Sequence, residues 1–228
     1  MEFRRRGLAV ALSLVSIAVL GPVTAAADPP PPPPPPPPPT ANAPTATGTV
    51  GYANAMVAGN TISIARLAAC DTEGAQTGFT RGATRNQVSI GWGWSQCGMD
   101  DEGNATVSVV GSLYVLPVVQ PLGGPAIWIG RYAVYCEASQ SHTWSTMRVS
   151  GVVGAWLPVR IPPNYTMIIP GRLPTDPIVA RIVLNEQIRT EPPDRSITVN
   201  VMRVQLFPSG ASANRGEFVA GSVHCSSH

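Results

Sequence analysis

The segment NQVSIGWGW, residues 86–94, carries the alternation that decides the class of fold. Its apolar side chains Val88, Ile90, Trp92 and Trp94 are separated by single small or polar residues, and adjacent side chains of a strand point to opposite faces. This period of two predicts a half-buried β-strand with those four side chains on one face. The segment TISIARL, residues 61–67, alternates in the same way.

Further candidate strands follow at regular intervals along the chain. They cover residues 104–116, 126–136, 144–159, 178–188, 196–207 and 216–225. Turn-forming runs separate them, and no window shows the 3.6-residue period of a substantial helix. About eight to ten strands at this spacing predict an all-β fold, an antiparallel β-sandwich of Greek-key or jelly-roll-like type, with a closed barrel as the alternative.

One candidate strand changes the phase of its alternation. Its apolar residues occupy odd positions from Ile197 to Val201 and even positions from Met202 to Leu206. A β-bulge near Val201 and Met202 would reconcile the two halves. The alternative is a central strand that is covered on both faces.

The N-terminus resembles a secretory signal. Arg4, Arg5 and Arg6 precede an apolar run, and residues 25–27 are three alanines of the kind that a signal peptidase cleaves. An uncleaved membrane anchor would need about 20 apolar residues, whereas Gly21 interrupts this run earlier. We therefore expect residues 1–27 to be a signal peptide, with no transmembrane helix after its removal.

A proline run follows the expected cleavage site. Residues 29–39 are all proline, and each ring fixes φ and removes an amide donor, which favours polyproline II. Residues 28–48 are therefore interpreted as a low-complexity spacer, in preference to a ligand for a proline-binding groove. Residues 49–228 have a suitable size for a single β-sandwich domain.

Four cysteines would enter an oxidising space on export, and an even number there predicts disulfides. Cys70, Cys97, Cys136 and Cys225 allow three connectivities. The preferred pairing is Cys70 with Cys97, which could clip a hairpin, and Cys136 with Cys225, which could tie the last strand to the core. Their spacing does not suit zinc, and no metal site is expected.

The charge of the chain argues against nucleic-acid binding. Removal of residues 1–27 takes away three of the 15 basic side chains and one of the 13 acidic ones, which leaves a formally neutral protein. A nucleic-acid footprint needs a basic surplus. All basic residues are arginine, which together with abundant Ala, Gly and Pro suggests a bacterial genome rich in G and C.

The sequence contains no nucleophile elbow, phosphate-binding loop or paired zinc-binding histidines. Ser141 and His142 are adjacent, but adjacent side chains on a strand point to opposite faces, so this pair is expected not to act as nucleophile and base. We therefore expect no catalytic residues and no cofactor.

Two further features have ordinary structural explanations. The acidic run at residues 100–102 is flanked by glycines and is expected to form a solvated turn, although a cation site is an alternative. The tryptophans Trp92, Trp94, Trp128, Trp144 and Trp156 are expected to pack in the core or against a disulfide. The alternative is that they form a platform for a ligand.

Four segments of the C-terminal third carry a family resemblance. PPNYTMIIPG (162–171), DPIVARIVLNEQ (176–187), SITVNVMRVQL (196–206) and GEFVAGSVHC (216–225) resemble the closing strands of the choice-of-anchor P family of secreted actinobacterial proteins. Arg203 departs from the histidine of that pattern, and the chain has no apolar C-terminal tail. The resemblance implies an extracellular β-rich module and supplies no catalytic residues.

Together these features predict an exported non-enzymatic protein of the cell envelope or extracellular space, with a structural or interaction role. The alternatives are a pore-forming envelope protein that resembles the mycobacterial porins, and an envelope hydrolase that uses His142. The ligand or partner and the oligomeric state are not predicted.

Overall fold

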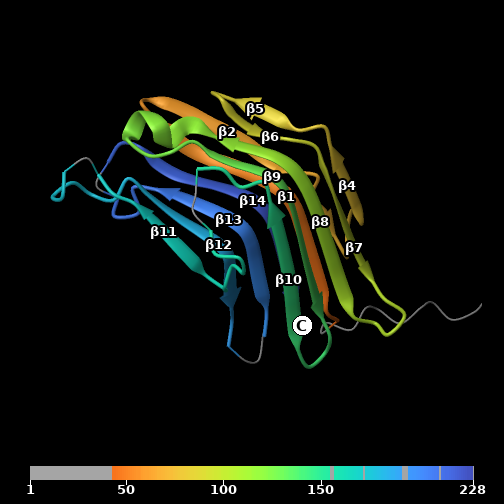
Figure 1. Ribbon diagram of the computed structural model, residues 1–228. Coiled ribbons are helices and arrows are strands. Elements are labelled where there is room, and N and C mark those ends of the chain that lie inside the picture. Colours follow the sequence, from red (N-terminus) through yellow and green to blue (C-terminus); the bar gives the residue numbers. More distant parts are fainter. Residues whose placement is uncertain (1–42, 155–156, 172, 192–194, 211, 228) are drawn as a thin grey trace, which may run out of the picture. The chain divides into compact units, whose positions relative to one another are not determined.

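The computed structural model describes residues 43–154, 157–171, 173–191, 195–210 and 212–227. The chain divides into two units, residues 1–38 and 39–228. The expected signal peptide and the proline run therefore lie outside the described residues. The second unit consists almost entirely of β-strands in two antiparallel sheets that pack together (Figure 1).

Sheet A has seven strands, and its order follows the chain except at one junction. Across the sheet they are β11 (Tyr165–Ile169), β12 (Ala180–Arg189), β13 (Ile197–Leu206), β14 (Arg215–Ser226), β1 (Thr45–Val57) and β2 (Asn60–Leu67), with β3 (Cys70–Asp71) also beside β1. At the junction the last strand, β14, pairs with the first, so that Thr45 lies opposite Ser226.

Sheet B also has seven strands, and four short ones form the two interrupted arms of one hairpin. β10 (Thr143–Ser150), β9 (Ile127–Ala138) and β8 (Ala105–Leu116) are followed by β6 (Val88–Ile90) and β7 (Gly93–Met99), which both pair with β8. β5 (Ala83–Arg85) and β4 (Thr77–Thr80) pair with β6 and β7, respectively. A short 3₁₀ helix, η1 (Pro117–Leu122), connects β8 to β9.

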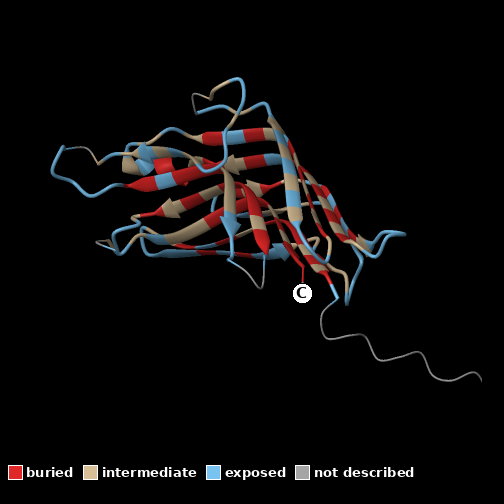
Figure 2. Ribbon diagram, turned by 90° about the horizontal axis from the view of Figure 1, so that it is seen from below, coloured by how far each residue is buried: buried red, intermediate tan, exposed pale blue. Residues whose placement is uncertain are grey.

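These sheets confirm the predicted all-β sandwich, and no closed barrel is present in the described part of the chain. Neighbouring strands are joined in sequence except in the pairs β14–β1, β1–β3, β6–β8 and β4–β7. The inward-facing residues form one core, and buried and exposed positions alternate along most strands (Figure 2).

Two expected boundaries were wrong. β1 begins at Thr45, so residues 45–48 belong to the sheet and not to the spacer. Their small side chains suit the core, because a Cβ at Gly48 would lie 2.6 Å from Val107 Cγ2. The strand expected over residues 144–159 ends at Ser150, where Gly151 with a φ of 67° turns the chain.

The phase change in β13 arises without a bulge. The register with β14 is constant, since Asn200 pairs with Ser222 and Met202 pairs with Ala220. Val201 and Met202 are both buried in the core, but Thr198 and Arg203 on the other face are only partly buried, so the strand is not covered on both faces and neither expected explanation holds. Asn185 and Gly221 flank Val201 on the two neighbouring strands.

Those two flanking residues have φ values of 50° and 58°, respectively. The strands of sheet A therefore change phase along one transverse line, which we call the crease of sheet A. A row of such residues lets a sheet bend without breaking its register.

Sheet B has a crease of its own, and glycine marks most of it. Gly91, Leu113, Gly130 and Gly151 lie side by side across the sheet, and their backbones are joined by hydrogen bonds from Gly91 to Leu113 and from Gly130 to Gly151. Leu113 has a φ of 53°. On either side of this line the opposite parity of residues faces the core.

Tyr132 connects the two sheets at these creases. Its hydroxyl donates a 2.7 Å hydrogen bond to the Val50 carbonyl of sheet A. Its ring packs where Gly111 and Gly221 have no side chain, since a Cβ on Gly221 would lie 2.9 Å from the ring. The two glycines therefore provide the space that this tyrosine fills.

Both disulfides also join sheet A to sheet B. Cys70 of β3 is bonded to Cys97 of β7, and Cys136 of β9 is bonded to Cys225 of β14. The preferred pairing is confirmed, but the first bond links two sheets and does not clip a hairpin. No helix among the described residues is both long enough and apolar enough to span a membrane.

Candidate functional site

The four described tryptophans lie on the surface and not in the core, contrary to the preferred interpretation of the sequence. The exposed fractions are 51% for Trp92, 36% for Trp94, 47% for Trp128 and 43% for Trp144. Trp156 lies outside the described residues. Large aromatic surfaces left in water on a folded domain mark interaction sites.

The crease of sheet B explains why the apolar residues of the segment 86–94 do not share one face, contrary to the prediction. Val88 and Ile90 are fully buried, but the chain changes phase at Gly91, so that Gly93, Ser95 and Cys97 face the core in β7. Trp92 and Trp94 consequently point to the outer face. The four apolar residues alternate in sequence, but they do not share one face.

Strand register places Trp94 in a row that crosses the outer face of sheet B. Phe79 pairs with Trp94, Trp94 with Val110, Val110 with Ala133, and Ala133 with Arg148. Phe79 is 69% exposed. Directly paired side chains on one face lie about 4.5–5.5 Å apart, so this row is a continuous apolar strip with an arginine at its β10 end.

A parallel row of neutral hydrogen-bonding side chains lies next to the apolar row. It consists of Thr77, Gln96, Ser108, Tyr135 and Thr146, each paired with the next across strands β4, β7, β8, β9 and β10. None of these five side chains carries a formal charge at neutral pH. The outer face therefore offers aromatic rings beside neutral donors and acceptors.

The next row adds a second aromatic pair. Trp144 is paired with Glu137, and its ring centroid is 5.1 Å from that of Tyr135 at a 50° interplanar angle. The Tyr135 hydroxyl donates a 2.8 Å hydrogen bond to Glu137. Burial, together with this carboxylate, raises the pKa of Tyr135 above its usual value, so the phenol stays protonated at neutral pH.

On the other side of the crease the same face continues with apolar residues. Trp128 pairs with Val115 of β8 and forms an isolated bridge with Val153. Leu113 and Val153 are 51% and 61% exposed, respectively. We call the set Phe79, Trp92, Trp94, Leu113, Trp128, Tyr135 and Trp144 the aromatic face.

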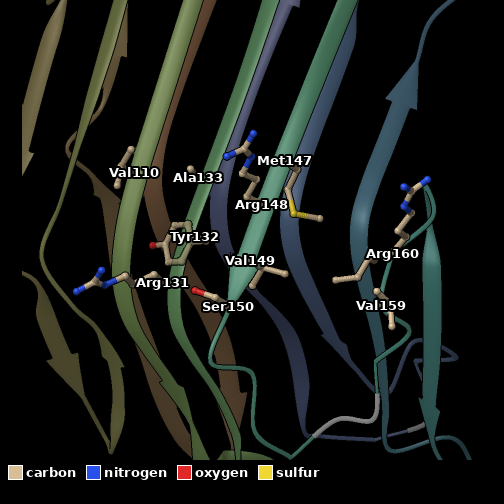
Figure 3. Close-up of a pocket in the computed structure, with 11 residues that line it drawn as sticks. Val110, Arg131, Tyr132, Ala133, Met147, Arg148, Val149, Ser150, Val159 and Arg160 are labelled. Carbon is tan, nitrogen blue, oxygen red and sulfur yellow. The ribbon is translucent and has the colours of Figure 1, made fainter.

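A hollow of about 710 Å³ adjoins this face at the edge strand β10. Val110, Ala133 and Arg148 of the apolar row line it, and Figure 3 shows Met147 and Val149 pointing from β10 toward the segment that carries Val159. The apolar row and the hollow thus share Val110, Ala133 and Arg148.

Three arginines line the same hollow. Arg131, Arg148 and Arg160 come from β9, β10 and the segment after it (Figure 3). No described carboxylate forms an ion pair with any of them. Unpaired guanidinium groups are well suited to bind carboxylate or phosphate groups through paired hydrogen bonds.

A second hollow, of about 410 Å³, lies on the outer face of sheet A and is polar. Arg203, the residue that departs from the family pattern, forms ion pairs there with Glu186 at 3.3 Å and Glu217 at 2.8 Å. Asn200 donates to Glu186, and Tyr52 donates to Glu217. The groups at its centre satisfy one another, so we regard the cluster as a structural network.

Burial and the neighbouring Glu217 raise the pKa of Tyr52. The tyrosine therefore remains a hydrogen-bond donor within this network at neutral pH. The guanidinium carbon of Arg66 lies 5.1 Å from the centroid of the Tyr52 ring. Arg66 therefore covers one side of that ring through a cation–π contact.

Ser141 and His142 are closer to each other than expected. They lie in the turn between β9 and β10 and not on a strand, so Ser141 Oγ approaches His142 Nδ1 to 3.3 Å and Ser139 Oγ approaches it to 2.8 Å. The two side chains therefore do not point to opposite faces of a strand, contrary to the prediction. These contacts are local to an exposed turn, and no described carboxylate is hydrogen-bonded to the ring.

The acidic run at residues 100–102 forms a turn, as the preferred interpretation of the sequence predicted. Asp100 accepts hydrogen bonds from the backbone amides of Glu102 and Asn104 and from the Asn104 side chain. The bonds from Asn104 lower the pKa of Asp100. No group of three His, Cys, Asp or Glu residues in the described part of the chain is arranged to hold a metal ion.

No protein-family model, curated protein or solved structure matches this chain significantly. The resemblance to the choice-of-anchor P family therefore stays a prediction. The aromatic face is the candidate functional site, and the sequence indicated it only through the alternative that the tryptophans form a platform.

Proposed function

We propose that this protein is an exported, non-enzymatic binding module of the cell envelope or extracellular space, and that the aromatic face is its contact surface. The two disulfides indicate an oxidising, non-cytoplasmic environment. Export itself is supported by the leader-like residues 1–27.

One observation carries the binding role: all four described tryptophans are at least 36% exposed and lie on one face of one sheet. Burial of such side chains stabilises a folded protein. Because all four remain exposed on a domain that has a hydrophobic core, we infer that they contact a partner. Rigid rings on a sheet also lose little entropy on binding.

The proposal is tested by cosedimentation of the purified protein with the envelope fraction of the cells that produce it. The double substitution Phe79→Ala and Trp94→Ala removes the aromatic end of the apolar row. Ile188→Ala is the matched control, because Ile188 is 46% exposed on sheet A.

We expect the wild type and the control to sediment with the envelope and the double variant to remain in the supernatant. Equal sedimentation of all three proteins would contradict a role for the aromatic face. Far-ultraviolet circular dichroism of each variant checks that the fold is retained.

A further inference from the structure

We propose that the aromatic face binds a linear polysaccharide that carries acidic groups. Sugar rings would stack on the exposed aromatic side chains, and the acidic groups would bind the arginines at the β10 edge. This inference rests on the proposed function and names the class of ligand that the same surface takes.

The length of the face indicates a polymer. Trp128 and Glu137 lie nine positions apart on β9, and Glu137 is paired with Trp144. At about 3.3–3.4 Å per residue the two tryptophans lie up to about 30 Å apart along the strand. Between their levels lie Trp94 and Tyr135, so rings recur along the track in a way that a single small molecule cannot use.

The chemistry of the neighbouring row indicates sugars. A pyranose ring presents C–H groups on its faces and hydroxyl groups around its rim, so it needs an apolar plane beside neutral hydrogen-bonding groups. Gln96, Ser108 and Thr146 supply amide and hydroxyl groups next to the Phe79–Trp94 strip. A surface that inserts into lipid would instead carry fewer polar side chains between its apolar ones, because each unpaired polar group in hydrocarbon costs free energy.

The charges indicate acidic substituents on the polymer. Arg148 ends the apolar row, and Arg131 is its diagonal neighbour on β9, two positions from the paired residue Ala133. Glu137, the acidic residue next to the neutral row, accepts a hydrogen bond from the Tyr135 hydroxyl. It lies four positions along β9 from Ala133, the residue paired with Arg148, and forms no ion pair with either arginine. The surface thus presents unpaired positive charge to its ligand, complementary to carboxylate or phosphate groups.

The experiment is native affinity electrophoresis of the full chain in gels that contain a soluble polymer. The acidic probe is polygalacturonate, a linear chain with a carboxylate on each sugar, and the neutral probe is hydroxyethylcellulose. Flotation with phosphatidylglycerol vesicles tests a membrane as the partner, and light scattering coupled to gel filtration tests a second copy of this chain.

We expect polygalacturonate to retard the wild type and the Ile188→Ala control. Phe79→Ala with Trp94→Ala should lower the affinity about tenfold or more. Trp94→Phe, which keeps an aromatic ring, should retain most of the binding. Arg131→Gln with Arg148→Gln should abolish the preference for the acidic polymer over the neutral one and flatten the dependence on salt.

The inference is overturned by the absence of retardation in polygalacturonate, by equal retardation in the neutral polymer, or by retardation that the aromatic substitutions leave unchanged. Flotation with vesicles, or a dimer that the same substitutions dissociate, would assign the face to a membrane or to a second copy and also overturn it. If the double aromatic variant loses envelope sedimentation while the wild type ignores polygalacturonate, this inference fails and the proposed function stands.

Discussion

Two buried tyrosines of sheet B predict opposite responses to the same substitution. Tyr132 and Tyr114 lie on neighbouring strands with 2% and 0% of their surfaces exposed, respectively. The Tyr132 hydroxyl donates to the Val50 carbonyl, whereas the Tyr114 hydroxyl has no hydrogen-bond partner in the described structure. Replacement by phenylalanine removes one oxygen atom in each case.

The magnitudes follow from what each oxygen leaves behind. Tyr132→Phe leaves the Val50 carbonyl without this donor at the centre of the domain, and an unsatisfied buried group costs about 1–3 kcal/mol. Tyr114→Phe removes a buried hydroxyl whose own desolvation costs about 1–3 kcal/mol in protein mutants. We therefore expect Tyr132→Phe to lower the free energy of unfolding and Tyr114→Phe to leave it unchanged or raise it.

The assay is equilibrium unfolding in urea with both disulfides intact, followed by circular dichroism at pH 7. Burial raises the pKa of both phenols, so both are neutral at that pH and no charge changes with either substitution. A loss of stability in Tyr114→Phe as large as that in Tyr132→Phe would refute the reasoning, because it would show that the Tyr114 hydroxyl is bonded in solution.

Four further changes probe other parts of the molecule by the same urea assay. Gly221→Ala should cost about 2–4 kcal/mol, because the residue has a φ of 58° and its Cβ would lie 2.8 Å from Val201, whereas Gly98→Ala, with open space around it, should be neutral. Loss of the disulfide with the sequence separation of 89 residues should cost about 1 kcal/mol more than loss of that with 27; equal costs would contradict the loop-entropy argument. Arg203→Met should lower the free energy of unfolding by about 1–3 kcal/mol, because the half-buried carboxylates of Glu186 and Glu217 lose their cationic partner. Asp100→Asn should weaken the loss of stability in acid. Because the pKa of Asp100 is lowered in the fold, this carboxylate stabilises the fold above its unfolded pKa near 3.8 and stops doing so as the pH falls through the lowered value. An unchanged dependence of stability on pH in acid would exclude this contribution.

The class of fold could be predicted because alternation is a local signal. The strands at residues 61–67, 104–116 and 126–136 were placed within a few residues, since a sheet with one buried face imposes the period of two on each strand. The pairing of the cysteines was also predicted correctly, although the reason given for the first pair was wrong. Whether two strands share a sheet depends on contacts far apart in sequence, and alternation does not contain that information.

The outward position of the tryptophans could not be read by the same rule, because the rule assumes that a strand keeps its phase. Gly91 ends one phase and Gly93 begins the other, and a mid-strand glycine is a recognised signal for a kink or close approach. Reading residues 86–94 as two short strands around Gly91 would have placed Trp92 and Trp94 outside. Leu113, with its left-handed φ, carries no such signal in its side chain.

The crease that bends sheet B therefore also places the rings of the aromatic face on the surface. If β6 and β7 continued in one phase, Trp92 and Trp94 would point inward with Ile90, and Gly93, Ser95 and Cys97 would point outward. The inward phase of β7 is fixed by Cys97, which is bonded to Cys70 of sheet A, and by Gly93, where a Cβ would lie 2.8 Å from Val50. The contacts that hold the two sheets together thus determine which way the aromatic rings point.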